Sequence, residues 1–254
     1  MTFDELWVNS PIVLRELAAE FVRRGDECLK ADKESQLTAC MFLALRSVSL
    51  LLGMAKVMEP ETRDSWDVLA RALQESTDLL MYFRFDEDGV RKKIEYWFAG
   101  KGDSAWKADH HKCEEFIRRL GEGETELAVR WSAMTVFSHP TVYAAQNSAK
   151  NVAGWVTGFA KTESPTDTIL PKIADYLTSI SKLMVVATFD LPGWVPLGFD
   201  LNRMPTADRF QRECKNVVGP ILAMNQKITL PEGSYRSPSD KTARSAKVKK
   251  NPKG

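Results

Sequence analysis

One stretch constrains the fold more than any other, the segment from Trp66 to Phe85. Apolar side chains recur there every three or four residues, which is the period of one face of an α-helix. Apolar residues continue onto the neighbouring faces, so that only a narrow sector stays polar. The main apolar face consists of Trp66, Leu69, Leu73, Ser76, Leu80 and Phe83. Because a helix that is apolar over most of its circumference belongs inside a bundle, we expect residues 66–85 to form the helix around which the others pack.

The polar sector of this helix is the first place to consider function. Arg71 lies one turn from Asp67 and one turn from Glu75, a spacing at which opposite charges can meet. The ordinary interpretation is a solvated stripe of ion pairs, each contributing roughly 0.3–0.5 kcal/mol. The alternative is a polar seam inside the bundle that lines a site, because the carboxylates of the sector outnumber Arg71. The sector also contains Gln74 and Asp78.

Length and composition favour one helical domain with a tail. The chain has 254 residues, of which 44% are hydrophobic and 27% are charged, and this composition supports an apolar core. We expect an all-α fold, a multi-helix bundle of seven to nine helices over residues 1–230, followed by a disordered basic tail over residues 231–254. The four cysteines are widely separated in the sequence, which does not indicate a disulfide framework.

Capping and turn residues predict where the helices begin and end. Ser10 and Pro11 indicate an N-cap and a first helical position, so we expect the first helix to begin there and to end near Ala31. Small residues in segment 141–159 favour close helix packing, and they make a homo-oligomer a further possibility. The other expected helices span about 34–58, 62–85, 90–100, 105–120, 124–137, 141–159, 172–188 and 206–228.

The most apolar run of the chain is residues 39–55. It is 17 residues long and contains Arg46, whereas a membrane-spanning helix needs about 20 mostly apolar residues and an arginine near its centre is costly. The N-terminal segment also lacks the apolar run of a secretory signal. We therefore expect a buried core helix, no membrane association and a cytoplasmic location.

Residues 191–205 form a loop with three prolines, two glycines and the large aromatic residues Trp194 and Phe199. Two interpretations are open. The loop packs on the body as a lid, as the rarity of exposed aromatic patches favours, or it presents its aromatic residues to a protein partner.

The three histidines are candidates for chemistry. His110 and His111 each have a glutamate one turn later, which could begin a metal site. No further ligands are identifiable, so we expect an exposed charged helix face there, with no metal and no cofactor. His139 precedes Pro140 at the end of a predicted helix, where the helix dipole favours its cationic form. It is therefore either a helix cap or a general acid or base.

Charge is concentrated at the C-terminal end. Residues 236–254 carry seven basic residues and one acidic residue, a net charge of +6, so that residues 1–235 carry −5 of the total of +1. Such an arm binds phosphate backbones electrostatically without reading sequence, and RNA or DNA is the predicted partner. The alternative is a terminus that only aids solubility. The predicted nucleic-acid-binding residues are Arg236, Lys241, Arg244, Lys247, Lys249 and Lys250.

Two motifs resemble those of a known family. Arg71-Ala-Leu-Gln-Glu75, on a helix that continues to Leu-Leu-Met-Tyr-Phe, is similar to an R-x-x-x-E signature, and the segment Trp131 to Pro140 is similar to an "S…HP" signature. In this order they resemble a set of bacterial and phage all-helical proteins known only as a domain of unknown function. The resemblance covers roughly residues 10–190. It implies an all-α fold in which Arg71, Glu75 and His139 meet in space, and it implies no settled activity.

The chain is more distantly similar to HEPN domains, which are often ribonuclease toxins or nucleotide-handling modules in defence systems. Their signature is an arginine followed four to six residues later by a histidine. Here Arg130 precedes His139 with eight residues between them, a departure from that signature.

Three functions follow as hypotheses. The first is a non-enzymatic helical interaction module, in phage defence or nucleic-acid handling. The second is a ribonuclease or phosphodiesterase in which His139 acts as general acid or base, Arg71 stabilises phosphate charge and Glu75 orients a partner. The third is an oligomeric scaffold assembled through residues 141–159. The enzyme requires its three residues to converge at an accessible cleft, and the module does not.

Overall fold

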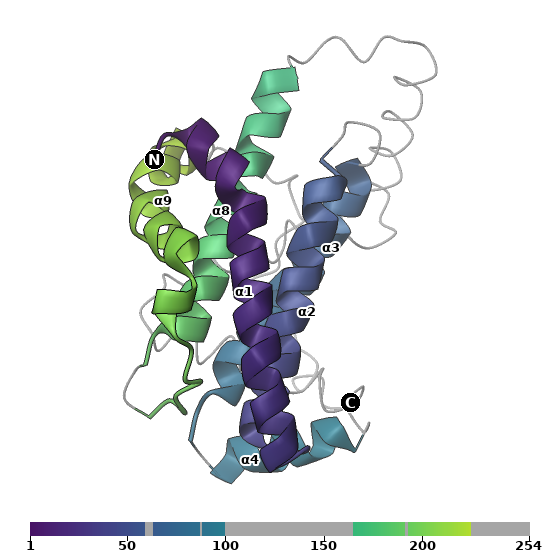
Figure 1. Ribbon diagram of the computed structural model, residues 1–254. Coiled ribbons are helices and arrows are strands. Elements are labelled where there is room, and N and C mark those ends of the chain that lie inside the picture. The colour runs from purple at the N-terminus through teal and green to yellow at the C-terminus, as the bar shows by residue number, and fades with distance from the viewer. Residues whose placement is uncertain (59–62, 87, 100–164, 191–192, 225–254) are drawn as a thin grey trace, which may run out of the picture.

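The computed structural model describes residues 1–58, 63–86, 88–99, 165–190 and 193–224 (Figure 1). This part of the chain is 83% helical and contains no strands, which confirms an all-α fold. Six α-helices and one 3-10 helix lie in it. The helices predicted at 105–120, 124–137 and 141–159 lie outside the described residues, as does the predicted tail. The elements are α1 (Phe3–Ala31), α2 (Gln36–Lys56), α3 (Arg63–Phe83), α4 (Asp88–Phe98), α8 (Pro165–Thr188), η2 (Leu201–Arg203) and α9 (Pro205–Met224).

Helix α1 begins eight residues before the predicted start at Pro11. Thr2 is its N-cap, and Thr2 and Glu5 form a reciprocal capping box. Pro11 lies inside the helix, where it has no N–H for the carbonyl of Trp7 four residues earlier. The Ser10 hydroxyl donates to that carbonyl at 2.8 Å instead. The predicted start was wrong because Ser10 satisfies the carbonyl that the proline leaves free, rather than capping a new helix.

The helix at the centre of the described bundle is α2 rather than α3. Helix α2 packs against α1, α3, α4 and α8, whereas the main contacts of α3 are with α2, α4 and α8. Its buried residues include Cys40, Ala44, Ser47, Leu51 and Met54, while Leu52 of the same apolar run is 44% exposed. The helical-face argument predicted α3 as an interior helix, but it did not account for the more continuously apolar α2.

Among the described helices, α2 alone is long enough and apolar enough to cross a membrane. More than half of its most apolar 18-residue window, 56%, is buried inside the molecule. Core helices of soluble proteins meet the same criterion.

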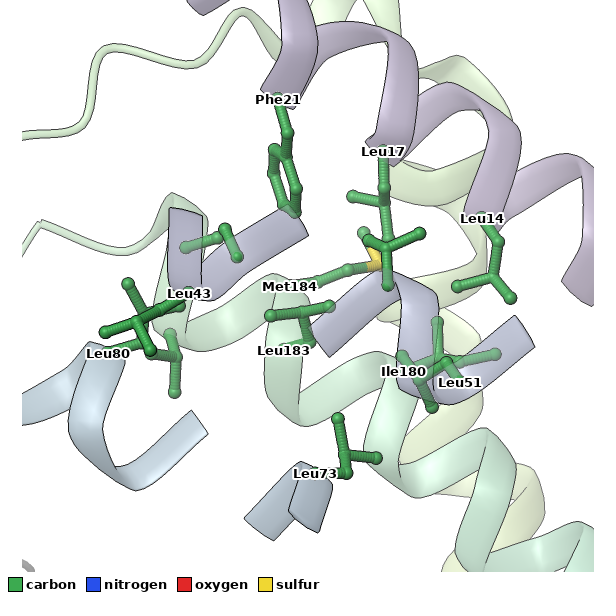
Figure 2. Close-up of a cluster of buried hydrophobic side chains, with 14 of the residues drawn as sticks. Leu14, Leu17, Phe21, Leu43, Leu51, Leu73, Leu80, Ile180, Leu183 and Met184 are labelled. Atoms are coloured by element: carbon green, nitrogen blue, oxygen red, sulfur yellow. The ribbon is translucent and has the colours of Figure 1, made fainter. Parts of the chain in front are cut away.

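The hydrophobic core brings the first three helices together with α8, which follows them by more than 80 residues in the sequence. Leucine side chains from α1, α2 and α3 meet Ile180, Leu183 and Met184 of α8 (Figure 2). Each of these residues is at most 4% exposed. The labelled members are Leu14, Leu17, Phe21, Leu43, Leu51, Leu73, Leu80, Ile180, Leu183 and Met184. Burial of this many large apolar side chains is the main favourable contribution to folding.

The last two helices differ from prediction mainly at their boundaries. Helix α8 ends at Thr188 as expected but begins at Pro165, earlier than the predicted start at residue 172. Helix α9 runs over Pro205–Met224 and packs on α8 and α1. Its first turn is capped from a distant part of the chain, since Glu16 of α1 accepts hydrogen bonds from the backbone N–H groups of Thr206 at 3.3 Å and Ala207 at 2.9 Å. These N–H groups have no partner within the helix.

Replacing Glu16 with alanine should therefore destabilise the fold by about 1 kcal/mol, the typical cost of losing an N-cap. The matched control is Glu27→Ala on the same helix, because Glu27 is 47% exposed and, among the described residues, forms its ion pairs with Arg23 and Arg24 of α1. That change should leave the stability nearly unchanged, because exposed ion pairs contribute little. Urea denaturation measures both values, and equal losses would contradict the capping role.

Candidate functional site

The polar sector of α3 faces α8 and forms a charged seam with it. We define the seam as Asp67, Arg71, Glu75 and Asp78 of α3 with Lys172 and Lys182 of α8. Lys172 Nζ lies 3.6 Å from Asp67 Oδ1, and Lys182 Nζ lies 3.5 Å from Asp78 Oδ1. Lys172 also lies over the ring of Trp66, at 4.7 Å from its centroid. The two lysines of α8 thus supply positive charge for the carboxylates of α3, which outnumber Arg71.

Asp78 shows that the seam is not an ordinary solvated stripe. Asp78 is only 4% exposed. The side-chain amide of Gln74 donates to its two carboxylate oxygens at 2.6 and 2.8 Å. A buried carboxylate needs such partners because leaving water costs several kcal/mol. The solvated interpretation was therefore wrong at Asp78, and the alternative of a polar seam within the bundle describes this position.

The predicted site residues Arg71 and Glu75 do come together. Arg71 Nε donates to Glu75 Oε1 at 2.9 Å, and the two side chains are 22% and 29% exposed. His139, the third predicted catalytic residue, lies outside the described residues, and so do His110, His111 and every predicted nucleic-acid-binding residue of the tail. The convergence of Arg71, Glu75 and His139 stays a prediction.

A narrow cleft runs beside the seam between α3 and α8. It is lined by Ala70, Leu73, Gln74, Thr77, Asp175, Thr178, Ser179 and Lys182. The hydroxyls of Thr77, Thr178 and Ser179 donate to helix carbonyls at 2.8 to 3.0 Å. With their hydrogens committed to the backbone, these hydroxyls are acceptors and not activated nucleophiles. The cleft has room for ordered water rather than for a nucleotide.

A second polar centre lies at the C-terminal end of α3, where Arg84 is fully buried. Its guanidinium donates to the carbonyl oxygens of Val186 and Phe189, each at 2.6 Å. It also donates to the carbonyl of Val195 from Nε at 3.3 Å and from Nη2 at 3.2 Å. In return, the Val195 N–H donates to the Arg84 carbonyl at 2.6 Å. Arg84 thus binds the segment that leaves α8.

The positive charge of Arg84 is matched at the surface. Nη2 donates to Asp190 Oδ1 at 2.7 Å, and the guanidinium lies 4.5 Å from the ring centroid of Trp194. Burial lowers the pKa of Arg84, and the hydrogen bond to Asp190 opposes that shift. An arginine in this setting stays charged, so Asp190 provides the counter-charge.

The segment from Phe189 to Met204, which we call the strap, connects α8 to α9 and contains η2. Its residues 191 and 192 lie outside the described part. Its second half is held by α1. Arg24 Nε donates to the Leu197 carbonyl at 2.8 Å, and Glu20 accepts from the Asp200 N–H at 3.1 Å. The rings of Phe21 and Phe199 are 4.6 Å apart. Trp194 is buried, so the aromatic residues pack on the body, while a protein partner at 191–205 stays a prediction.

Glu20 is the second buried charge that the sequence motifs do not single out. Arg23 donates two hydrogen bonds to its carboxylate, at 2.8 and 2.6 Å. These bonds, with the one from Asp200, hold the pKa of Glu20 below its usual value against the opposing effect of burial. Arg84 therefore holds the first half of the strap by hydrogen bonds, and Glu20 holds the second half.

The described cysteines are poor candidates for chemistry. Cys28, Cys40 and Cys214 are buried and free. Burial raises the pKa of Cys40 to about 12 and that of Cys214 to about 11, so these thiols are protonated at neutral pH and not nucleophilic. Within the described ranges, no group of three or more histidine, cysteine or acidic side chains is placed to hold a metal ion.

Comparison with protein families, with curated proteins and with solved structures finds no match to this chain. The family resemblance carried by Arg71, Glu75 and His139 therefore stays a prediction, and function has to be argued from the residues.

Proposed function

We propose that the chain is a non-enzymatic nucleic-acid-handling module, in which a helical body carries a basic arm that binds single-stranded RNA or DNA. The observation that carries the proposal is the separation of charge, with +6 in residues 236–254 and −5 in residues 1–235. The arm attracts phosphates, while the acidic body repels them. Binding through such an arm is electrostatic and independent of sequence.

The chemistry of the described body supports this proposal. Its most buried charged groups, Arg84, Glu20 and Asp78, are used to hold segments of the fold together. The cleft beside the seam is narrow, and the thiols are protonated. The buried charged side chains therefore stabilise the body and do not form a reactive centre.

The test is fluorescence anisotropy with a labelled single-stranded RNA over a salt series. We expect the affinity of the full chain to fall with a slope of about −4 in log K against log salt if six phosphates are neutralised. A chain ending at Tyr235 should bind at least about tenfold more weakly at low salt. A full-length variant in which the six predicted arm residues are replaced by glutamine separates charge from length. Undiminished binding by the truncated chain would contradict the proposal.

One observation favours a second candidate function, an RNA-cleaving phosphodiesterase. Arg71 and Glu75 form a partly exposed pair beside the cleft, where an arginine could stabilise phosphate charge if His139 lies near them. This candidate predicts RNA cleavage that disappears in His139→Ala. The interaction module predicts RNA binding without cleavage.

A further inference from the structure

A groove lies between the end of α8, the strap and the first turns of α9. It is an open hollow of about 530 Å³, lined by Thr188, Phe189, Asp190, Leu201, Asp208, Gln211 and Arg212. Phe189 is 54% exposed and Leu201 is 39% exposed. Two large apolar side chains in a hollow with a polar rim are typical of a binding surface.

The charges of the groove favour a cationic occupant. Its lining includes the carboxylates Asp190 and Asp208, with Arg212 as the one cation among the lining residues. The carbonyl end of α8 adds a partial negative charge, and the amino end of α9, whose first turns line the groove, adds a partial positive one. Because Arg84 lies behind Asp190 and Arg212 donates to Asp208 at 2.8 Å, the net attraction is modest. The apolar floor must therefore contribute to binding, so a suitable occupant combines an apolar side chain with neighbouring positive charges.

The chain contains a segment with this chemistry. Residues 247–250 read Lys-Val-Lys-Lys, and Val248 is the one large aliphatic side chain in the basic arm, residues 236–254. We infer that this segment docks in the α8–α9 groove of its own chain, with Val248 against Phe189 and Leu201 and the lysines toward Asp190 and Asp208. The inference deepens the proposed function and rests on it, because the docked segment is part of the arm that binds nucleic acid.

The length of the chain allows this contact. Lys247 follows Met224, the end of α9, by 23 residues, which can span up to roughly 75 Å when extended. The helix rise places Met224 about 24 Å from Asp208 along α9. A segment tethered at this range has an effective concentration on the order of millimolar, so a weak contact is sufficient.

Docking would regulate the arm by competition. The lysines of residues 247–250 cannot bind a phosphate backbone and the groove carboxylates at the same time. Nucleic acid must therefore displace the segment, and weakening the groove should increase the affinity of the full chain for RNA.

The experiment measures the groove without RNA. A fluorescein-labelled peptide of residues 236–254 is titrated with the chain ending at Tyr235, and anisotropy reports binding. Phe189→Ser and Asp208→Asn should each weaken binding about fivefold or more, through loss of apolar contact and of charge. The matched control is Val8→Ser on α1, a residue that is 68% exposed and does not line the groove, and this change should leave the affinity unchanged. The full chain should bind the peptide at least about fivefold more weakly than the truncated chain, because its own arm competes.

Absence of peptide binding, equal binding of a peptide with the same residues in scrambled order, or equal binding by the full and truncated chains would each overturn the inference. The labelled peptide is also titrated with single-stranded RNA. A peptide that binds RNA but not the groove leaves the proposed function intact and overturns docking. A peptide that binds the groove but not RNA supports docking as a contact and contradicts the proposed function.

Discussion

Replacing Arg84 with methionine is expected to lower the free energy of unfolding by about 3 to 5 kcal/mol, because it removes a buried hydrogen-bond donor from three backbone carbonyls. Methionine fills part of the volume but donates no hydrogen bond. The carbonyls of Val186, Phe189 and Val195 would then lose their partner, and each unsatisfied buried group costs about 1–3 kcal/mol. Asp190 adds little, because it is exposed and can be solvated. Urea denaturation measures the loss.

The matched control is Arg91→Met. Arg91 is exposed and pairs with the exposed Asp86, so its replacement should leave the free energy of unfolding nearly unchanged. If Arg84→Met does not fold, Arg84→Lys keeps the charge and some of the hydrogen bonds, and it should retain part of the stability. Hydrogen exchange then provides a local readout, because the Val195 amide is bonded to the Arg84 carbonyl. A loss below 1 kcal/mol in Arg84→Met, with protection of Val195 unchanged, would contradict the account of the strap.

Replacing Asp78 with alanine is expected to destabilise the fold by about 2 to 3 kcal/mol, since hydrogen bonds to charged groups contribute about 1.5–3 kcal/mol. The change removes both bonds from Gln74 and the ion pair with Lys182. Lys182 is 23% exposed and can reach water, which keeps the loss smaller than that at Arg84.

The control for Asp78 lies on the same helix. Glu75→Ala removes one partner of Arg71 from a partly exposed pair and should cost less than about 1 kcal/mol. Thermal or urea denaturation of the two variants tests the difference between a buried and an exposed carboxylate. Equal losses at the two positions would show that the seam is a solvated stripe after all.

Helix identity followed from the sequence because apolar periodicity and turn residues act locally. Helix α2 ends at Lys56, two residues before the predicted end at residue 58. Helix α4 begins at Asp88, two residues before the predicted start at residue 90. The central helix was wrongly predicted, because a helical face gives no information about which neighbours cover it. The start of α1 was wrong because Ser10 acts through its hydroxyl on the Trp7 carbonyl, an interaction that a capping pattern does not distinguish from an N-cap.

The polar centres were harder to predict because their partners are distant in sequence. Arg84 contacts residues more than 100 positions away, and Glu20 binds the amide of Asp200, 180 positions away. One signal was present for Arg84, since it interrupts an apolar run from Leu79 to Phe85. A charged residue in such a run is either at the surface or buried with dedicated partners, and only the fold distinguishes the two. Arg71 and Glu75 were easier to pair because they lie one helical turn apart.

The central claim is that the chain binds nucleic acid through its arm and performs no chemistry on it. A denaturing gel tests this most directly, with labelled single-stranded RNA incubated with the full chain, the chain ending at Tyr235, and His139→Ala. The account predicts intact RNA in every lane, together with salt-sensitive binding that the truncated chain has largely lost. RNA cleaved by the full chain and left intact by His139→Ala would contradict it, and would assign the site to Arg71, Glu75 and His139.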